Sequence, residues 1–314
     1  DLMAWLTPHF ERSPELFKTM FRMDRSRFDQ VAESLEALKE DTRKKGKHGR
    51  PIGCPERVEP KIALAMTLRY LAGGAACDIQ VIFNVTRSTF KTTLKRTLEQ
   101  LCTNVLPTWA LPRALESASS GQGSAELDAI SSGFNKASHG FIPRCIGAID
   151  GILIPIRAQK RDRTFYCRKG FHAMNVQAIA DSHGRLIFAH VGATPGSAHD
   201  SFAWKETELC GKMRDVGEPF GDWLKAHGRH LIGDDAYASG HTMAVPWPGT
   251  FDAKSPKLAY NFVHSSARMC VERAFGMLCR KWLLLKRPYE GSLRRTVNSA
   301  GFHITVVVAM KLHN

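Results

Sequence analysis

Four acidic residues lie at positions where a carboxylate is unusual unless it has a chemical role. Asp150 interrupts the apolar run 144–156, where a charged group costs several kcal/mol unless it is paired or bound to metal. Asp234 directly follows a second apolar run at 230–233, and Asp200 lies in a Pro-Gly-Ser-Ala-His-Asp-Ser sequence at 195–201. Between positions 254 and 314, eleven basic residues accompany only two acids, one of which is Glu272. These carboxylates are the first candidates for chemistry.

Three of these acids also have an ordinary structural interpretation. Asp150 precedes Gly151, and Asp-Gly is a common turn sequence. Asp200 is placed to cap the N-terminus of the helix expected after it. Glu272 follows Arg268 by four residues, a spacing that forms a weak ion pair on a helix. The residues alone leave these alternatives open.

The charge of the chain suggests what such carboxylates would act on. With 44 Lys and Arg against 30 Asp and Glu, the formal net charge is +14, which favours a polyanionic partner such as nucleic acid. Acids within a basic protein predict a divalent metal held near a phosphate. Oxygen ligands favour Mg²⁺ or Mn²⁺ over zinc. Two such ions, about 3.5–4 Å apart, would activate a water or a 3′-hydroxyl for phosphoryl transfer.

The sequence predicts a helical region, a linker and an α/β region, and the last of these carries the four acids. Residues 1–110 have a helical apolar rhythm and predict an all-α domain. Residues 111–140 are rich in Ser and Gly and predict a linker, which a short helix at about 126–134 could interrupt. Residues 141–314 predict an α/β domain with a mixed sheet, having strands at 144–156, 173–180, 185–191 and 230–233 and helices at about 201–213 and 266–285. Ligands gather at strand ends in such sheets, so Asp150 and Asp234 are expected side by side.

Within the helical region, residues 78–101 have the form of a helix-turn-helix. A short helix at 78–83 precedes a polar turn at 84–86 and a second helix from Arg87, with Ser88 as its expected N-cap. The DNA-contacting candidates on the second helix are Arg87, Lys91, Lys95 and Arg96. An ordinary helical hairpin with a solvated basic face fits the same pattern equally well.

A second group of basic residues follows Asp150 and predicts a phosphate-binding rim beside the metal site, with a solvated basic loop as the alternative. Its members are Arg157, Lys160, Arg161, Arg163, Arg168 and Lys169.

Composition excludes several other classes of protein. The eight cysteines include no CxxC pair, which argues against a zinc ribbon or a disulfide scaffold. The histidines His172, His190 and His199 fit no zinc spacing. No apolar run approaches the ~20 residues of a membrane span. The chain begins without Met, so it is expected to be an excerpt of a longer product.

Beyond these patterns, an ordered set of motifs from about Pro143 onward resembles the PIF/Harbinger transposase family. The set comprises Ala148-Ile149-Asp150-Gly151, Arg168-Lys169-Gly170, Asn175-Val176-Gln177, the 195–201 sequence, Gly233-Asp234-Asp235-Ala236-Tyr237, Tyr260-Asn261, His264-Ser265, Val271-Glu272-Arg273-Ala274-Phe275-Gly276 and Leu312-His313-Asn314. The N-terminal helices resemble the family's helix-turn-helix region less specifically.

The resemblance implies an RNase H-like fold with a DDE catalytic centre. The family's catalytic acids fall on Asp150, Asp234 and Glu272, with Asp235 as the alternative to Asp234. The Asp of the Pro-Gly-Ser motif falls on Asp200, which the resemblance assigns to the site of two divalent ions together with the three catalytic acids.

The implied function is that of a DNA transposase, which hydrolyses double-stranded DNA at transposon ends and transfers the strand to target DNA. The resemblance also implies a nuclear homo-oligomer and a separate Myb-like DNA-binding partner. The alternative is a transposase-derived DNA-binding protein that has lost catalysis.

Overall fold

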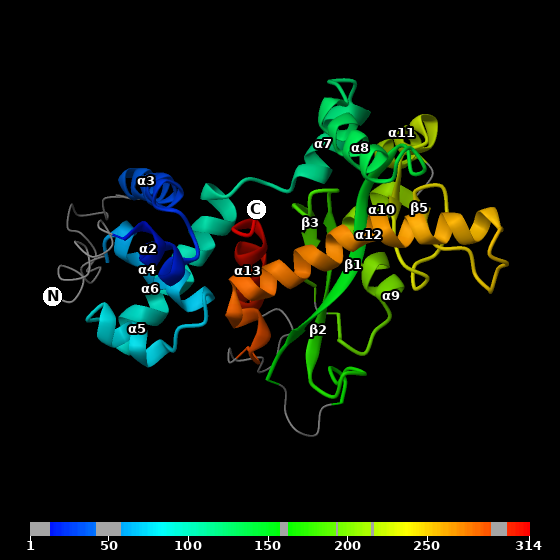
Figure 1. The fold of residues 1–314 in the computed structure, drawn as a ribbon. Coiled ribbons are helices and arrows are strands. Elements are labelled where there is room, and N and C mark those ends of the chain that lie inside the picture. Colours follow the sequence, from blue (N-terminus) through cyan, green and yellow to red (C-terminus); the bar gives the residue numbers. More distant parts are fainter. Residues whose placement is uncertain (1–12, 42–57, 158–162, 193, 215–216, 290–299) are drawn as a thin grey trace. The chain divides into compact units, whose positions relative to one another are not determined.

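The computed structural model describes residues 13–41, 58–157, 163–192, 194–214, 217–289 and 300–314, and Figure 1 shows its fold. Lys160 and Arg161, two of the basic residues predicted to form the phosphate-binding rim, lie outside the described residues. The chain divides into two compact units. The first unit comprises residues 1–107 and 281–286, and the second comprises residues 108–280 and 287–314.

The first unit is helical and is built around α4 (Pro60–Leu71). This helix is apolar on most sides, and Leu64, Met66 and Leu68 have no exposed surface. It packs against α2 (Pro14–Phe21), α3 (Arg25–Asp41), α5 (Ala76–Ile82), α6 (Arg87–Gln100) and the short 3₁₀ segment η2 (Leu283–Lys286). Burial of its apolar side chains stabilises the unit.

Helices α5 and α6, with the turn between them, lie where the sequence predicts a helix-turn-helix. Thr86 rather than Ser88 is the N-cap of α6, and its hydroxyl accepts the backbone N–H of Thr89 at 3.2 Å. Phe90, Thr97 and Leu98 form the buried stripe of α6. The helix is followed by a π-helical segment, η1 (Leu101–Val105).

The second unit contains a five-stranded mixed sheet in the order β3-β2-β1-β4-β5. Its strands are β1 (Cys145–Pro155), β2 (Ala173–Ala180), β3 (Leu186–His190), β4 (His230–Ile232) and β5 (Met243–Ala244). The pairs β1–β2 and β2–β3 are antiparallel, whereas β1–β4 and β4–β5 are parallel. A mixed sheet of this kind, flanked by helices, fits an RNase H-like DDE fold.

The segment predicted as a linker, residues 111–140, is instead mostly helical, so this prediction is wrong. It forms most of α7 (Ala110–Ser119) and all of α8 (Ala125–Ala137), which contact β3 and β1, respectively. Although the segment is rich in Ser and Gly, it has apolar residues at helical spacing that become buried. These are Leu111 and Leu115 in α7 and Leu127, Ile130 and Phe134 in α8.

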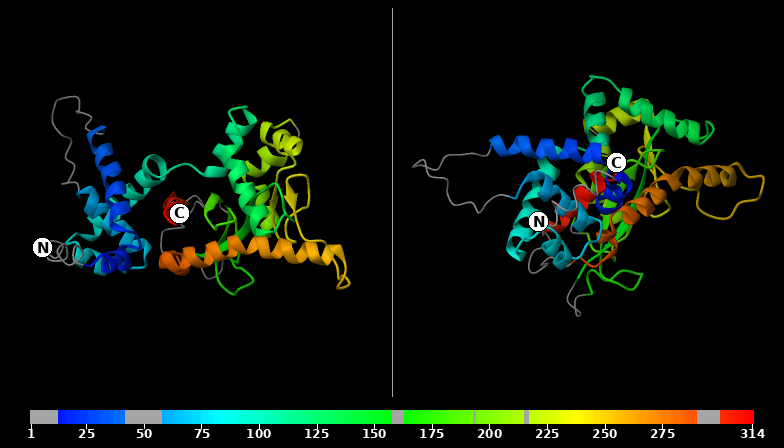
Figure 2. Two further views of the ribbon diagram at one scale, coloured as in Figure 1. Left: turned by 45° about the horizontal axis from the view of Figure 1, so that its top comes forward. Right: turned by 60° about the vertical axis from the view of Figure 1, so that its left-hand side comes forward.

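Further helices complete the described part of the second unit. Three follow β3, namely α9 (Asp200–Lys205), α10 (Glu208–Arg214) and α11 (Pro219–His227). The helix predicted at 201–213 is therefore divided, and the Thr207 hydroxyl accepts the backbone N–H of Cys210 at the start of α10. The long helix α12 (Pro256–Lys281) is continuous in both views of Figure 2 and begins ten residues before its predicted start. The last helix is α13 (Ala300–Lys311).

The closing Leu-His-Asn sequence forms hydrogen bonds with backbone groups of the edge strand β3. The Asn314 carboxamide accepts the Leu186 backbone N–H at 2.9 Å and donates to the Leu186 carbonyl oxygen at 2.8 Å. This pair satisfies backbone groups that an edge strand otherwise exposes. No helix in the described part of the chain is long and apolar enough to cross a membrane.

Candidate active site

The strand register brings Asp150 and Asp234 together. In the parallel pair β1–β4, Ala148 lies opposite Ile232, and each aspartate follows two residues later on its own segment. Asp234 is half-buried and its Oδ1 accepts the Ala236 N–H at 3.0 Å, while Asp235 is exposed. Of the two alternatives for the second acid, Asp234 is therefore the one that faces Asp150.

Asp150 is a carboxylate with too few favourable partners for its burial. Its side chain is 18% exposed, and it accepts the Gly151 N–H at 2.9 Å and the Arg268 guanidinium at 3.0 Å. Burial raises the pKa of Asp150 to about 6, and the negative charges of Asp234 and Asp200 act in the same direction. Arg268 opposes that rise only in part. Burial also raises the pKa of Asp234.

Glu272 is connected to this group through α12. The Arg268 guanidinium donates to Glu272 Oε1 at 2.6 Å and to Asp150 Oδ2 at 3.0 Å. The ion pair expected from the four-residue spacing is present, but the same arginine also binds the acid of β1. Glu272 is 40% exposed, so it lies at the open side of the group.

Asp200 reaches the group from α9, and it is not the N-cap that one interpretation of the sequence expected. His199 occupies the N-cap position, and Asp200 lies in the first turn. Its Oδ1 accepts the Asn175 side-chain amide at 2.7 Å and the Gln177 amide at 3.1 Å. A Cβ on Gly151 would lie 2.0 Å from this oxygen, so only glycine fits beside Asp150.

A buried polar network that the sequence analysis did not recognise holds Asp200 in place. The Tyr237 hydroxyl donates to Gln177 Oε1 at 2.7 Å, and the Gln177 amide donates to Asn175 Oδ1 at 2.9 Å. Burial raises the pKa of Tyr237 well above its usual value, and Asp200, Asp150 and Asp234 add to the rise. The available signal was two amide side chains in β2, a strand that is buried at every position.

The donor set fits a hard divalent cation, because every candidate ligand is a carboxylate. Among the described residues, however, no three His, Cys, Asp or Glu side chains are arranged to hold a metal ion. Asp200 lies against Gly151, and Arg268 contacts Asp150.

The predicted DNA-contacting residues lie in both units. Arg157, Arg163, Arg168 and Lys169 are exposed in the segment after β1. Arg168 and Lys169 occupy a tight turn from Cys167 to Gly170, whose φ of 85° favours glycine. In the first unit, Arg87, Lys91 and Lys95 are exposed on α6 and Arg96 is half-buried.

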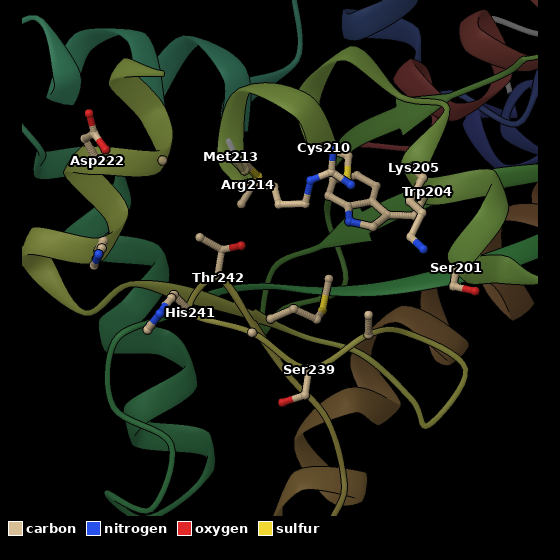
Figure 3. A pocket seen from close by; sticks show the side chains of 15 residues that line it. Ser201, Trp204, Lys205, Cys210, Met213, Arg214, Asp222, Ser239, His241 and Thr242 are labelled. Atoms are coloured by element: carbon tan, nitrogen blue, oxygen red, sulfur yellow. The ribbon is translucent and has the colours of Figure 1, made fainter. Parts of the chain in front are cut away.

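A pocket of about 260 Å³ lies beside α9, the helix that carries Asp200. Figure 3 shows Trp204, Cys210 and Met213 of α9 and α10 together with His241 and Thr242 of the segment that precedes β5. The lining includes three basic side chains, Lys205, Arg214 and Lys225, and one acid, Asp222.

Comparison with known proteins agrees with this fold. Residues 149–314 match the family model described as DDE superfamily endonuclease, which covers more than half of the chain, and the chain belongs to this family. Together with the relatives below, this match places it among the Harbinger-like DDE transposases.

Two curated relatives share part of the chain. The protein named "Putative nuclease HARBI1" from Bos taurus is 26% identical over 176 residues, and its namesake from Homo sapiens is 25% identical over the same length. In each case the match covers 55% of this chain and 46% of the relative. The chain thus spans about half the length of these relatives. No solved structure matches it.

Proposed function

We propose that this protein is a divalent-metal-dependent DNA endonuclease that cleaves at transposon ends and transfers the freed strand to target DNA. The observation that carries the proposal is the proximity of Asp150, in the middle of β1, to Asp234, just past the end of the paired strand β4, with Glu272 joined to Asp150 through one arginine. Membership of the endonuclease family supports this assignment.

Asp150, Asp234 and Glu272 are the proposed catalytic acids, and Asp200 is proposed to complete the metal-binding set. Two Mg²⁺ or Mn²⁺ ions bound there would polarise a phosphodiester and lower the pKa of the attacking water or 3′-hydroxyl. Asn175 and Gln177 orient Asp200 by donating to one of its oxygens, which leaves the other oxygen for a ligand.

Double-stranded DNA is the proposed substrate, and the exposed cations are its proposed contacts. The turn with Arg168 and Lys169, together with Arg157 and Arg163, would bind phosphates near the acids. Lys205 and Lys225, which line the pocket beside α9, are further proposed phosphate contacts. The helix-turn-helix would read the transposon end through α6. A nuclear location, self-association and a Myb-like partner belong to the same proposal.

One observation favours a second candidate, a DNA-binding protein that has lost catalysis. Arg268 forms ion pairs with two of the acids, Asp150 and Glu272. The same basic surfaces would serve this function without cleavage.

A nicking assay separates the two candidates. The full chain is incubated with duplex DNA that carries terminal inverted repeats, over a titration of Mg²⁺ and Mn²⁺. We expect metal-dependent nicking that disappears in Asp234→Asn and persists in Asp235→Asn, whose side chain is exposed. DNA binding without nicking at any metal concentration would instead support the second candidate.

DNA binding by α6 is tested through its charges. Replacing Lys91, Lys95 and Arg96 together with Ala is expected to weaken binding and to flatten the salt dependence, by a slope of about 0.9 for each lost phosphate contact. Fluorescence anisotropy of a labelled duplex at several salt concentrations measures both quantities. Lys61→Ala, which removes an exposed cation of α4, is the control. Unchanged affinity and slope in the triple variant would make α6 a structural helix.

A further inference from the structure

Arg268 makes contacts that a surface arginine on a helix does not make. One guanidinium nitrogen donates to Asp150 Oδ2 at 3.0 Å, and another donates to Glu272 Oε1 at 2.6 Å. Its side chain is only 15% exposed, although α12 could direct a long basic side chain into solvent. The arginine therefore joins two acids that lie 122 positions apart in the sequence.

The chemistry of arginine makes this contact a persistent one. The guanidinium stays charged at every accessible pH, and its planar set of donors binds two carboxylates at once. Among the described residues, Asp150 has few other favourable partners, because its backbone donor is the N–H of Gly151, and Asp200 and Asp234 repel it. Arg268 thus supplies the positive charge that the acid group lacks.

We propose that Arg268 is a built-in counter-cation that competes with divalent metal for Asp150 and Glu272. The inference rests on the proposed function, since it concerns the metal of that same site. An ion ligated by both carboxylates would compete with Arg268 for Asp150 Oδ2 and Glu272 Oε1, so we expect the ion to displace the arginine from them. Arg268 therefore sets the metal concentration at which the site assembles.

This competition accounts for two features of the structure. It gives a reason why no three acidic, histidine or cysteine side chains of the described residues are arranged around one point. It also gives a reason why a buried arginine accompanies acids whose proposed role is to bind cations. Arg268 is a positioning residue in this account, because it acts on the acids and not on the substrate.

The test is metal binding by the full chain without DNA. Mn²⁺ affinity is measured by isothermal titration calorimetry for wild type, Arg268→Gln and Arg273→Gln. Arg273 lies on the same helix next to Glu272, is exposed, and donates to the Met269 carbonyl oxygen. Its substitution removes the same charge from the same helix without touching Asp150, so it controls for long-range electrostatics.

We expect Arg268→Gln to bind Mn²⁺ about tenfold more tightly than wild type, because hydrogen bonds to a charged group no longer compete. Arg273→Gln should bind as wild type does. Without metal, Arg268→Gln should melt at a lower temperature than wild type, and saturating Mn²⁺ should narrow that gap. If Arg268→Gln does not fold, Arg268→Lys keeps the charge but loses the bridging geometry and should show a smaller gain in affinity.

Equal or weaker Mn²⁺ binding in the folded Arg268 variants overturns the inference, as does an absence of binding in all chains. The nicking assay keeps the two proposals distinct. Nicking by wild type with no gain in Mn²⁺ affinity in the variants overturns the competition alone. A gain in affinity without nicking by wild type overturns the endonuclease and leaves the competition intact.

Discussion

Two aspartates of the same sheet, Asp181 and Asp150, show opposite ways of burying a carboxylate. Asp181 follows β2 in the hairpin turn to β3 and is 1% exposed. Its Oδ1 accepts the N–H groups of His183 and Arg185, both at 2.9 Å, and its Oδ2 accepts the Arg185 guanidinium at 2.6 Å. Every contact of this carboxylate is favourable.

Asp150 has fewer donors and worse neighbours. It accepts one backbone N–H and one guanidinium, and it faces the negative charges of Asp234 and Asp200. The difference is the one expected between a structural carboxylate and the functional carboxylate that Asp150 is proposed to be. The oxygens of Asp181 accept hydrogen bonds from the turn that it stabilises, whereas those of Asp150 would remain able to bind a positively charged ligand.

The largest expected effect of this comparison is on cleavage. Asp150→Asn keeps the shape of the side chain but removes its charge, so DNA nicking should fall at least about a thousandfold, or about 4 kcal/mol of barrier. Glu272→Gln should have the same effect, and both variants should still bind DNA. Single-turnover nicking at saturating Mn²⁺ measures the rate, with Asp181→Asn as the control that retains it. Substantial residual cleavage in either variant would refute the assignment of the acids.

The same substitution, Asp150→Asn, should raise the stability of the fold although it lowers cleavage. Its pKa of about 6 lies above the ordinary 3.8, so the folded chain binds this proton more tightly than the unfolded chain. The stability that this group contributes is therefore complete below pH ~4 and is lost as the pH rises through ~6. The side chain of Asp150→Asn does not titrate, so this variant does not lose stability in that way. Its metal-free free energy of unfolding should exceed that of wild type by about 2 to 3 kcal/mol near pH 7. Urea unfolding across this pH range should show the gap closing toward pH ~4. A gap that is independent of pH would contradict this account.

Asp181→Asn should destabilise the fold. The amide oxygen can still accept the two backbone N–H groups, but the charge-assisted bond to Arg185 is lost, at a cost of about 2 kcal/mol. Urea unfolding at neutral pH measures this loss, and Arg185→Gln should reproduce much of it. A variant as stable as wild type would remove the structural half of the comparison.

The sequence predicted the sheet better than its surroundings. The strands β1, β2, β3 and β4 lie within one or two residues of their predicted bounds, because apolar β-forming runs mark them directly. Strand β5 has two residues and forms through pairing with β4, so no local pattern could reveal it. The segment predicted as a linker is helical because its few apolar residues recur at helical spacing, a signal that is weak beside its Ser- and Gly-rich composition.

At the site, the sequence could identify acids that were out of place but not their partners. A carboxylate within an apolar strand is a local signal, and Asp150 was recognised by it. The contacts of Asp150 with Arg268 and of Asp200 with Asn175 and Gln177 join residues that are 23 to 118 positions apart. Such contacts depend on the register of β2 and the packing of α9 and α12, which no local pattern reports.

The smallest effect, and the one that decides the role of a fourth acid, is expected at Asp200. Its Oδ1 is held by Asn175 and Gln177, as a structural carboxylate would be, yet its charge acts on Asp150 and Asp234. Asp200→Asn preserves most of the shape and is expected to weaken Mn²⁺ binding and to slow nicking at least about tenfold, or about 1.4 kcal/mol. Calorimetry with Mn²⁺ and single-turnover nicking measure these changes, and exposed Asp235→Asn is the control that should affect the rate much less than Asp234→Asn. If Asp200→Asn is folded and shows wild-type metal dependence and cleavage, Asp200 belongs with Asp181 as a structural carboxylate, and the metal site consists of Asp150, Asp234 and Glu272 alone.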